Sequence, residues 1–417
     1  MNVFSQTWVN VGTGLGAACI ALKSFGGELY AGGYLVSASH AASWNGTIWT
    51  PRAANMNGVI AALEEHSNSL FAGGAFDSAD GNAVNFIAGF NSPSSWVSIS
   101  STGADAPVET LESFGGELWI GGDFTWFDGL NPGPLAHGNI GGWSSVGNAF
   151  NGQVYSLKDC YGQLYAGGSL AWTNLSGNVG KWNGTSWDLV SSTSMGELWN
   201  GFVSSIAGYN GEVYAAGDFT IADSIYANRI ARWNGTTWNP IGSGVDGLND
   251  LVRCMIAFNN ELYAGGNFTM AGGIPANHIA KWNGTNWSAV GLGMNGEVMG
   301  MEVYNGDLYA CGFFTTAGGN PANYIARLVL ANSVIENDNG GTFSLSPNPA
   351  TNQLTIDNGE LQIETVEVYD VLGQLQHSTF DIQHSSFTLD VSSLSPGIYF
   401  VKIKTNEGEK AAKFVKE

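Results

Sequence analysis

Residues 252–291 read VRCMIAFNNELYAGGNFTMAGGIPANHIAKWNGTNWSAVG, and this stretch carries the pattern from which the fold follows. It divides into four strand-like pieces, VRCMIAF, LYAGGNFT, HIAKW and NWSAVG. The turn NNE separates the first two pieces, a Gly-rich loop the next two, and NGT the last two. Asn-Gly between aromatic-rich runs favours a type I′ hairpin turn, in which both central residues need positive φ. The stretch therefore predicts one four-stranded antiparallel sheet.

The second piece of this unit recurs seven times along the chain. Its copies are ELYAGG at Glu28, SLFAGG at Ser69, ELWIGG at Glu117, QLYAGG at Gln163, EVYAAG at Glu212, ELYAGG at Glu261 and DLYACG at Asp307. Their second residues are separated by 41, 48, 46, 49, 49 and 46 positions. A four-stranded repeat of about 40–50 residues is typical of propeller blades, and no 3.6-residue helical pattern is present.

The chain begins with the last piece of a repeat. QTWVNVG, at residues 6–12, has the pattern of NWSAVG, whereas the seventh copy stops at Leu328 without such a piece. We expect this N-terminal strand to pair with the last repeat and close the ring. The sequence thus predicts an all-β protein, with a seven-bladed β-propeller over residues 1–331 and an N-terminal strand that closes the last blade. A polar, Gly- and Asn-rich linker over 332–343 and a small C-terminal β-sandwich over 344–417 follow.

The repeats resemble those of Kelch-like propellers. They are more similar still to the LYxGGxFT…IAxWNGxxW repeats of fungal cortical cell-polarity markers and related bacterial surface proteins. The resemblance covers roughly residues 1–330 and implies an architecture rather than a ligand.

The C-terminal region carries a second set of motifs: PNP, YDVLG, SPGIYFVKI and a final KFVK. In order, spacing and position they resemble the C-terminal sorting domain of the type IX secretion system of Bacteroidota. The resemblance implies that the type IX machinery exports the chain to the outer cell surface or the medium, with the domain usually removed in transit. It implies a sorting signal formed by Pro347, Asn348, Pro349, Asp370, Gly373, Pro396, Gly397, Tyr399, Lys402, Lys413 and Lys416.

Composition excludes two classes of partner. The net charge is −21, and no Lys/Arg cluster offsets it, so we expect no nucleic-acid binding. No run of about 18 apolar residues is present, so we expect no membrane span. The start, MNVFSQTWVN, has neither the basic nor the apolar region of a signal peptide. Since sorting-domain proteins carry such a signal, we expect that it has been removed from this chain or lies upstream of this start. The alternative is a cytoplasmic protein in which the domain is passively retained.

Comparing the repeats with one another identifies a position where a site could form. The residue eight before the Leu of LYAGG is always small, as expected where inner strands crowd together. The residue nine before that Leu differs in every copy: Ile20, Ala61, Glu109, Tyr155, Ser204, Arg253 and Met299. Propeller ligands commonly bind at the mouth of the central channel, so Glu109, Tyr155 and Arg253 are our candidate ligand-binding residues. The alternative is that they are solvated rim residues or one structural ion pair.

Nothing in the sequence indicates a metal, a cofactor or a catalytic motif. Asp80, Asp128 and Asp223 share one loop position with Gly272 and Gly318, an exchange that indicates a turn with left-handed backbone. The calcium pattern DxDxDG is absent, as are metal-binding His spacings, the nucleophile elbow and the P-loop.

The cysteines lack the spacing of ligands or of a redox pair. Cys19 fills a Val position, Cys160 an aromatic position and Cys311 a Gly position. We expect buried free thiols. An exported protein could form disulfides, but the cysteines lie in different blades, which are generally too far apart to bridge.

Three functions fit these observations. The first, which we expect, is a non-catalytic binding or adhesion protein, secreted or on the cell surface, that recognises an extracellular glycan or protein. The second is a polysaccharide-active enzyme, a lyase or glycosidase, which needs converging carboxylates or a Tyr base with an Arg. The close similarity among repeats counts against it, since active sites usually break repeat symmetry with long insertions. The third is a structural spacer without a ligand.

Overall fold

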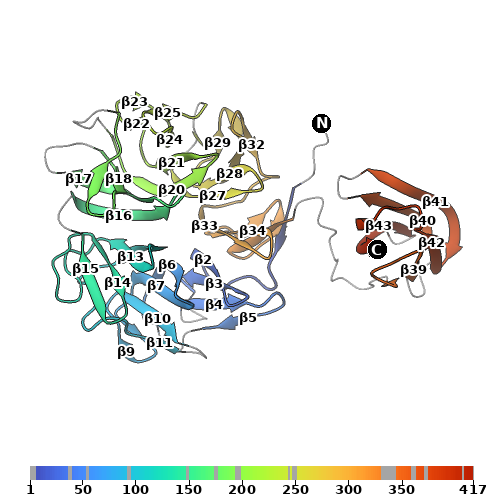
Figure 1. The fold of residues 1–417 in the computed structure, drawn as a ribbon, viewed down its shortest axis with the longest axis horizontal. Coiled ribbons are helices and arrows are strands. Elements are labelled where there is room, and N and C mark those ends of the chain that lie inside the picture. Colours follow the sequence, from blue (N-terminus) through green and yellow to red (C-terminus); the bar gives the residue numbers. More distant parts are fainter. Residues whose placement is uncertain are drawn as a thin grey trace. The chain divides into compact units, whose positions relative to one another are not determined.

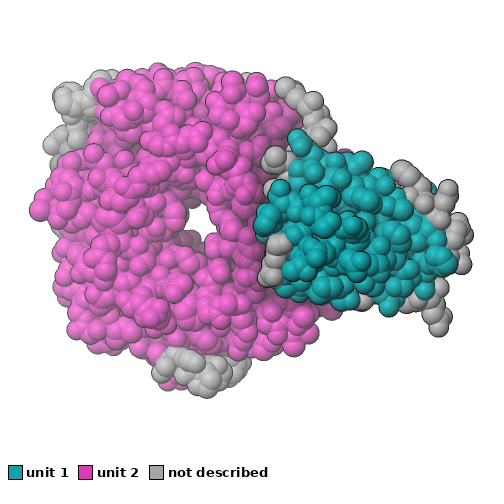
Figure 2. All heavy atoms as spheres, turned by 45° about the vertical axis from the view of Figure 1, so that its right-hand side comes forward, with its two compact units in different colours: residues 1–6, 329–417 teal, residues 7–328 magenta. Residues whose placement is uncertain are grey.

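The computed structural model describes residues 6–35, 40–52, 56–91, 95–146, 150–172, 177–192, 199–242, 245–246, 251–329, 344–357, 363–370, 374–405 and 408–416. Within these ranges the regular secondary structure is all β-strand, so the predicted all-β class is confirmed (Figure 1). The chain divides into two compact units, Thr7–Leu328 and a smaller one made of Met1–Gln6 with Val329–Glu417 (Figure 2). Across the described ranges, no helix is long and apolar enough to cross a bilayer.

Seven four-stranded antiparallel sheets make up most of the described part of the larger unit. In each, the first strand precedes the LYAGG-type second strand and the fourth carries a Trp. The third strand carries the IAxW pattern in sheets 5 and 6 and a variant of it in the others, such as VGKW in β18. Sheets 1 to 3 are β2 (Cys19–Phe25), β3 (Glu28–Gly33), β4 (Ala41–Trp44) and β5 (Trp49–Pro51); β6 (Val59–His66), β7 (Ser69–Ala75), β10 (Ile87–Asn91) and β11 (Ser95–Val97); and β12 (Val108–Phe114), β13 (Glu117–Gly122), β14 (Leu135–Asn139) and β15 (Gly142–Ser145).

The remaining sheets repeat this order. Sheets 4 to 7 are β16 (Phe150–Asp159), β17 (Leu164–Trp172), β18 (Val179–Trp182) and β19 (Trp187–Leu189); β20 (Val203–Tyr209), β21 (Glu212–Gly217), β24 (Ile230–Trp233) and β25 (Trp238–Pro240); β27 (Val252–Phe258), β28 (Glu261–Gly266), β31 (Ile279–Trp282) and β32 (Trp287–Ala289); and β33 (Val298–Tyr304), β34 (Asp307–Gly312), β37 (Ile325–Val329) and β1 (Thr7–Asn10).

Short strands form small ribbons, and all of them except β26 lie in the loops between second and third strands. They are β8 (Ser78–Ala79) with β9 (Asn82–Ala83), β22 (Ile221–Ala222) with β23 (Ile225–Tyr226), β26 (Val245–Asp246) with β29 (Met270–Ala271) and β30 (Ile274–Pro275), and β35 (Thr316–Ala317) with β36 (Asn320–Pro321).

Sheet 7 takes its fourth strand from the other end of the chain, since β1 follows β37 in its strand order. Trp8 Nε1 donates to Val290 O at 3.1 Å, and Asn320 Nδ2 donates to Trp8 O at 3.3 Å. This is the pairing that the sequence predicts for the N-terminal strand. The first strands contact one another in the cyclic order β2, β6, β12, β16, β20, β27, β33 and back to β2. Figure 2 shows an opening through the middle of this unit.

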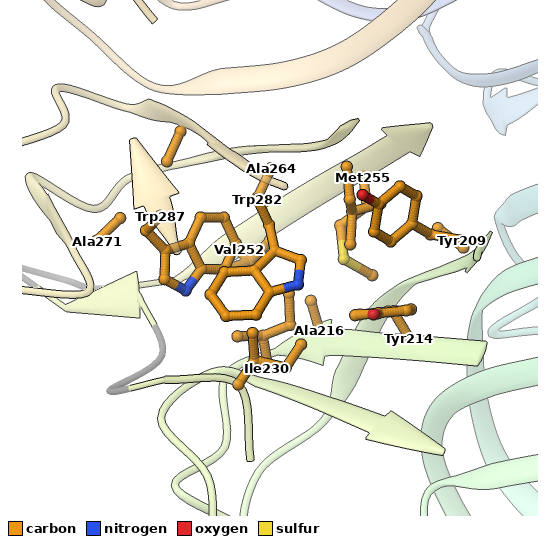
Figure 3. Close-up of a cluster of buried hydrophobic side chains, with 14 of the residues drawn as sticks. Tyr209, Tyr214, Ala216, Ile230, Val252, Met255, Ala264, Ala271, Trp282 and Trp287 are labelled. Atoms are coloured by element: carbon orange, nitrogen blue, oxygen red, sulfur yellow. The ribbon is translucent and has the colours of Figure 1, made fainter. Parts of the chain in front are cut away.

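The hydrophobic core lies between consecutive sheets. In Figure 3, Tyr214 and Ile230 of sheet 5 lie close to Met255, Trp282 and Trp287 of sheet 6, in one cluster of buried side chains. Burial of each such large side chain contributes about 1.5–3 kcal/mol to the free energy of unfolding. Each sheet therefore depends on both neighbours for its stability.

A Trp in the fourth strand links a sheet to the preceding one at four junctions. Its indole N–H donates to the backbone carbonyl three residues after the fourth-strand Trp of the preceding sheet. The four bonds are Trp8 Nε1 to Val290 O, Trp49 Nε1 to Val11 O, Trp96 Nε1 to Arg52 O and Trp238 Nε1 to Val190 O, at 3.1, 3.0, 2.8 and 2.9 Å.

One of the two kinds of hairpin turn differs from the prediction. Positive φ at both central residues, as in a type I′ turn, occurs in the first hairpin, at Asn259 (48°) and Asn260 (58°). In the WNGT hairpin Trp44 pairs with Trp49, so the loop has four residues and only Gly46 has positive φ, 101°. The Asn45 side chain accepts two backbone N–H groups of this loop, at 2.9 and 3.0 Å. The predicted type I′ turn at WNGT is therefore wrong, because the Asn side chain caps a longer loop.

The smaller unit contains two sheets. One is β38 (Ser344–Ser346), β39 (Gln353–Asp357) and β42 (Ser386–Asp390); the other is β41 (Leu375–His384), β40 (Ile363–Asp370), β43 (Gly397–Thr405) and β44 (Gly408–Lys416). Leu354 and Ile356 of the first sheet belong to the same buried cluster as Val366, Val401 and Phe414 of the second. The two sheets thus share one core.

Candidate functional site

The residue that varies from repeat to repeat is a β-bulge in all seven sheets. In sheet 3, Val108 pairs with Gly122 and Thr110 with Gly121, which leaves Glu109 without a partner in the ladder. A bulge residue does not follow the regular alternation of the strand, so its side chain points in a different direction. The sheet therefore requires no particular side chain at this position, which accounts for the different residues found there in the seven copies.

Glu109 lies beside a carboxyl group and a phenol. Burial raises the pKa of Glu109, and the nearby Asp123 raises it further. Burial also raises the pKa of Tyr155, and the charges of Asp123 and Glu109 add to this. Burial likewise raises the pKa of Asp123, although a hydrogen bond from Gln153 opposes the effect. Sheets 3 and 4 thus bring together two of the three predicted site residues and add Asp123.

Hydrogen bonds link these groups and leave one acceptor free. Tyr155 Oη donates to Gln153 Oε1, and the Gln153 side chain also bonds to Asp123. Asp123 Oδ1 is buried and has no hydrogen-bond partner among the described residues. The Tyr155 ring packs edge-on against Phe202, with centroids 5.4 Å apart. Asp123 and Tyr155 are half-buried rather than enclosed, and the Tyr155 hydroxyl oxygen can still accept a hydroxyl or amide N–H from a ligand.

Arg253 lies elsewhere. Its Nε is 2.7 Å from Glu297 Oε1, and within the described part of the chain no contact joins it to Glu109 or Tyr155. Arg253 is thus paired with Glu297, a residue outside the predicted set.

The same end of the ring carries an aromatic pair. In five sheets the residue five positions after the Leu of LYAGG donates its backbone N–H to the carbonyl two residues before the bulge. The five bonds are Tyr34 N to Ala18 O, Asp123 N to Pro107 O, Asp218 N to Phe202 O, Asn267 N to Leu251 O and Phe313 N to Glu297 O, all between 2.8 and 3.0 Å. These equivalent bonds place the five donors at one end of the ring.

Tyr34 and Phe313 are exposed at that end, by 45% and 47%, and their rings lie 5.9 Å apart. We call Tyr34, Phe313, Glu109, Asp123 and Tyr155 the rim site. Sequence reasoning missed its first, second and fourth members. The signal was available, because the residue after the second Gly of LYAGG also varies among the copies.

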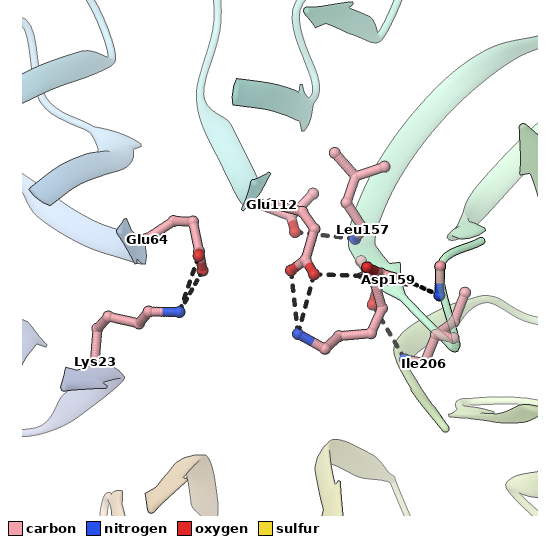
Figure 4. Close-up of polar contacts among 10 residues, drawn as sticks. Lys23, Glu64, Glu112, Leu157, Asp159 and Ile206 are labelled. Carbon is pink, nitrogen blue, oxygen red and sulfur yellow. Dashed lines mark hydrogen bonds and ion pairs between the residues drawn. The ribbon is translucent and has the colours of Figure 1, made fainter. Parts of the chain in front are cut away.

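A second charged group lines the space enclosed by the first strands. Figure 4 shows Lys23 and Glu64 directed toward this space from one side and Glu112 from the other. Lys23 Nζ is 2.8 Å from Glu64 Oε2, and Lys158 Nζ is 3.1 Å from Glu112 Oε2. Burial lowers the pKa of Lys158, but the carboxylates of Glu112 and Glu64 outweigh it and raise that pKa.

Glu302 belongs to the same group. Burial raises its pKa, whereas the charge of Lys23 lowers it. With Lys23, Glu64, Glu112 and Lys158, the group has three carboxylates and two ammonium groups. Most of its charge is thus paired within the protein, which favours a structural role.

Hydroxyl groups add further bonds between sheets. Small residues follow the bulge, and in three sheets a Ser or Thr there accepts a backbone N–H of the next first strand (Figure 4). The bonds are Leu157 N to Thr110 Oγ1, Ile206 N to Ser156 Oγ and Met255 N to Ser205 Oγ, at 3.0, 3.1 and 3.0 Å.

In the smaller unit, two of the predicted sorting residues hold the domain together. Asn348 Oδ1 accepts Val415 N at 2.9 Å, and its Nδ2 donates to Lys413 O at 3.3 Å. Tyr399 Oη donates to Ser395 O at 2.9 Å, and the Tyr399 ring stacks on Phe414. Asn348 thus connects the PNP segment to β44, and Tyr399 of β43 packs against β44.

The other predicted sorting residues differ in their surroundings. Asp370 Oδ1 accepts the Gln374 N–H at 2.9 Å, and Gly373 lies outside the described residues. Lys402 is half-buried and Lys416 is buried. The exposed members, which are available to a partner, are Pro347, Pro349, Pro396, Gly397 and Lys413.

The shared loop position has the predicted left-handed backbone. The φ angles are 49° at Asp80, 49° at Asp128, 50° at Asp223, 59° at Gly272 and 60° at Gly318. The carboxylates accept hydrogen bonds from nearby loops, such as Trp96 N to Asp80 Oδ2 at 2.6 Å. In the described part of the chain, no group of three His, Cys, Asp or Glu is placed to hold a metal ion.

The thiols agree with one expectation and contradict another. Cys19, Cys160 and Cys311 are buried and free, as predicted, and Cys254 is free and half-buried. The expected separation is wrong for one pair: Cys19 and Cys311, on the first and last repeats, lie in the same buried cluster, and the Cys19 thiol raises the pKa of the Cys311 thiol. Ring closure makes these two repeats neighbours.

Residues 344–417 match the family described as "Secretion system C-terminal sorting domain". This domain indicates export by type IX secretion to the cell surface or the extracellular space, so the predicted localisation is confirmed. No match was found among curated proteins.

Three solved structures have limited similarity to the chain. The computationally designed Ika8 protein has 12% identity and a TM-score of 0.46, with 98% of this chain and 99% of that chain covered. YjhT has 14% identity and a TM-score of 0.44, with 67% and 99% covered. A luciferin-regenerating enzyme has 9% identity and a TM-score of 0.36, with 76% and 92% covered. At these TM-scores, none of the three bears on the function of this chain.

Proposed function

We propose that the larger unit is a seven-bladed β-propeller and that the exported protein is a non-catalytic binding module that recognises a glycan through its rim site. The strand order of sheets 1 to 7 and the cyclic contacts of their first strands support the architecture. The export signal supports an extracellular ligand.

The observation that carries the proposal is the chemistry of the rim site. Sugars present apolar C–H faces and many hydroxyl groups. Tyr34 and Phe313 offer an exposed aromatic surface for the C–H faces. Asp123 and Tyr155, both half-buried, offer polar groups for the hydroxyl groups. Both sets lie at one end of the ring, as glycan recognition requires.

The test is a glycan array probed with the full-length chain. Tyr34→Ala/Phe313→Ala removes the aromatic pair, and we expect it to weaken binding at least about tenfold. Asp123→Asn keeps the size of the side chain but changes its hydrogen bonding, and should weaken binding as well. Tyr226→Ala is the matched control, because Tyr226 is 70% exposed on β23, a strand that contacts the fourth strand of sheet 5.

Either of two results would count against the proposal. If no glycan binds, a protein ligand or a spacer role replaces it. If binding survives the loss of both aromatic rings, the ligand sits elsewhere on the molecule.

An enzyme is the second candidate. Glu109 and Asp123 are neighbouring carboxyl groups with raised pKa values, and a phenol lies beside them, an arrangement also used for acid–base chemistry on sugars. Incubating any bound oligosaccharide with the protein and measuring product masses distinguishes the two. Shortened products that Glu109→Gln abolishes, while binding persists, would establish catalysis.

A further inference from the structure

The junctions between consecutive sheets share one close contact. The first Gly of LYAGG lies against the first-strand Val or Ile that precedes the bulge of the next sheet. A Cβ placed on Gly73 would lie 2.6 Å from Val108 Cγ1 and 3.1 Å from Val108 Cβ. The other Gly junctions are Gly32 with Ile60, Gly121 with Val154, Gly167 with Val203 and Gly265 with Val298.

Two junctions depart from this pairing. Between sheets 5 and 6, Ala216 stands at the Gly position. Between sheets 7 and 1, where the ring closes, Cys311 occupies the Gly position and Cys19 the Val position. Both cysteines are fully buried in one cluster, and the Cys19 thiol is close enough to raise the pKa of the Cys311 thiol.

The spacing at these junctions is close to that of a disulfide. At Gly121 and Gly265 the distance from an added Cβ to the facing Val Cβ is 3.0 Å. Disulfides span Cβ atoms about 3.5–4.5 Å apart, so a widening of roughly half an ångström suffices. Two cysteines at the facing positions are therefore placed to bond.

We propose that Cys19 and Cys311 form a disulfide that locks the ring closed after export. Each thiol loses a proton and an electron as the S–S bond forms. A disulfide-carrying oxidant of the cell envelope takes up both and is reduced to two thiols, so atoms and electrons balance. The extracellular destination of the chain makes the bond stable there.

The bond must form before the junction is fully packed. Thiolates attack disulfides, whereas burial raises the pKa of the Cys311 thiol well above its usual range and keeps it protonated in the closed ring. Cys254, at the neighbouring junction, is near enough to influence that pKa and is the competing partner. The experiment must therefore separate Cys19–Cys311 from Cys254–Cys311.

The first measurement is made on the full-length chain exported into an oxidising compartment. The protein is alkylated under denaturing, non-reducing conditions and digested, and its peptides are weighed. We expect two of the four cysteines, Cys160 and Cys254, to be alkylated and a cross-linked peptide to join Cys19 to Cys311. Alkylation of all four cysteines, or a Cys254–Cys311 cross-link, would overturn the proposal.

The second measurement is thermal unfolding with and without reductant. We expect reductant to lower the melting temperature of the wild-type chain by about 5–10 °C, since the bond closes a very long loop. Cys19→Val/Cys311→Gly restores the residue pair of the other junctions, so it should fold and be insensitive to reductant. Cys160→Ala/Cys254→Ala should stay as sensitive as the wild type. A reductant effect that persists in the first variant, or one absent from wild type, would contradict the proposal.

Discussion

At the scale of single residues, the bulge decides where this protein can vary. Glu109, Tyr155 and Arg253 occupy the one inner-strand position released from the ladder, and the sequence singles it out through its variety. The sequence could not predict which of these side chains lie next to one another, because the bulge in each sheet sets the direction of its own side chain. Asp123, directly after β13, completes the group, and Arg253 forms an ion pair with Glu297.

The raised pKa of Glu109 leads to a pH-dependent prediction. Its folded-state pKa lies above its unfolded value, so its contribution to stability is full below the unfolded pKa and is lost as pH rises through the folded pKa. Glu109→Gln should thus raise the melting temperature at pH 7 by about 1–3 °C and by less at pH 4.

Thermal melts across that pH range check this expectation. Asp188→Asn is the control, because Asp188 is an exposed carboxylate on β19, and it should shift the melting temperature little at either pH. A lower melting temperature for Glu109→Gln at pH 7 would show that the charge of Glu109 stabilises the fold.

At the scale of elements, the repeat made strands predictable but not their turns. Alternating patterns and regular spacing identified the strands, since each copy repeats the evidence of the others. The WNGT loop was misread because Asn-Gly fits both a two-residue turn and a longer loop capped by the Asn side chain, as at Asn45.

The indole hydrogen bonds allow a matched comparison. Trp238 and Trp187 are both buried at fourth-strand positions, but only Trp238 donates to the preceding sheet, at 2.9 Å to Val190 O. The Trp187 Nε1 atom is buried and has no partner among the described residues.

Trp238→Phe should therefore destabilise the fold more than Trp187→Phe. It leaves the Val190 carbonyl without its donor, whereas the second change removes a donor that was already unsatisfied. We expect a difference of about 1–3 kcal/mol in the free energy of unfolding, measured by denaturant titration. Equal losses would mean that ring packing, rather than the hydrogen bond, accounts for the effect of these residues.

At the scale of the whole molecule, closure of the ring followed from one short observation. QTWVNVG at the start and the missing last piece at the end predict the pairing that β1 makes with β37. The Cys19–Cys311 contact was missed because residues were compared along the chain rather than around the ring. Gly and Val at the matching positions of other copies were the available signal.

Deleting residues 1–10 tests the closing strand. The deletion removes β1, the Trp8 indole bond and the outer edge of sheet 7, and we expect the melting temperature to fall by more than about 5 °C. Removing residues 344–417 is the control, since that segment belongs to the other compact unit, and it should leave the melting transition of the ring in place. An unchanged melting temperature after the first deletion would show that closure does not depend on β1.

The position of β1 also sets an order of events for the growing chain. Its partner strand, β37, ends at Val329, and the sorting domain follows from residue 344. A ribosome that stops early, or a protease that cuts inside the repeats, produces a fragment that lacks both the partner of β1 and the export address. Completion of the ring and the signal for export thus depend on the same last part of the chain.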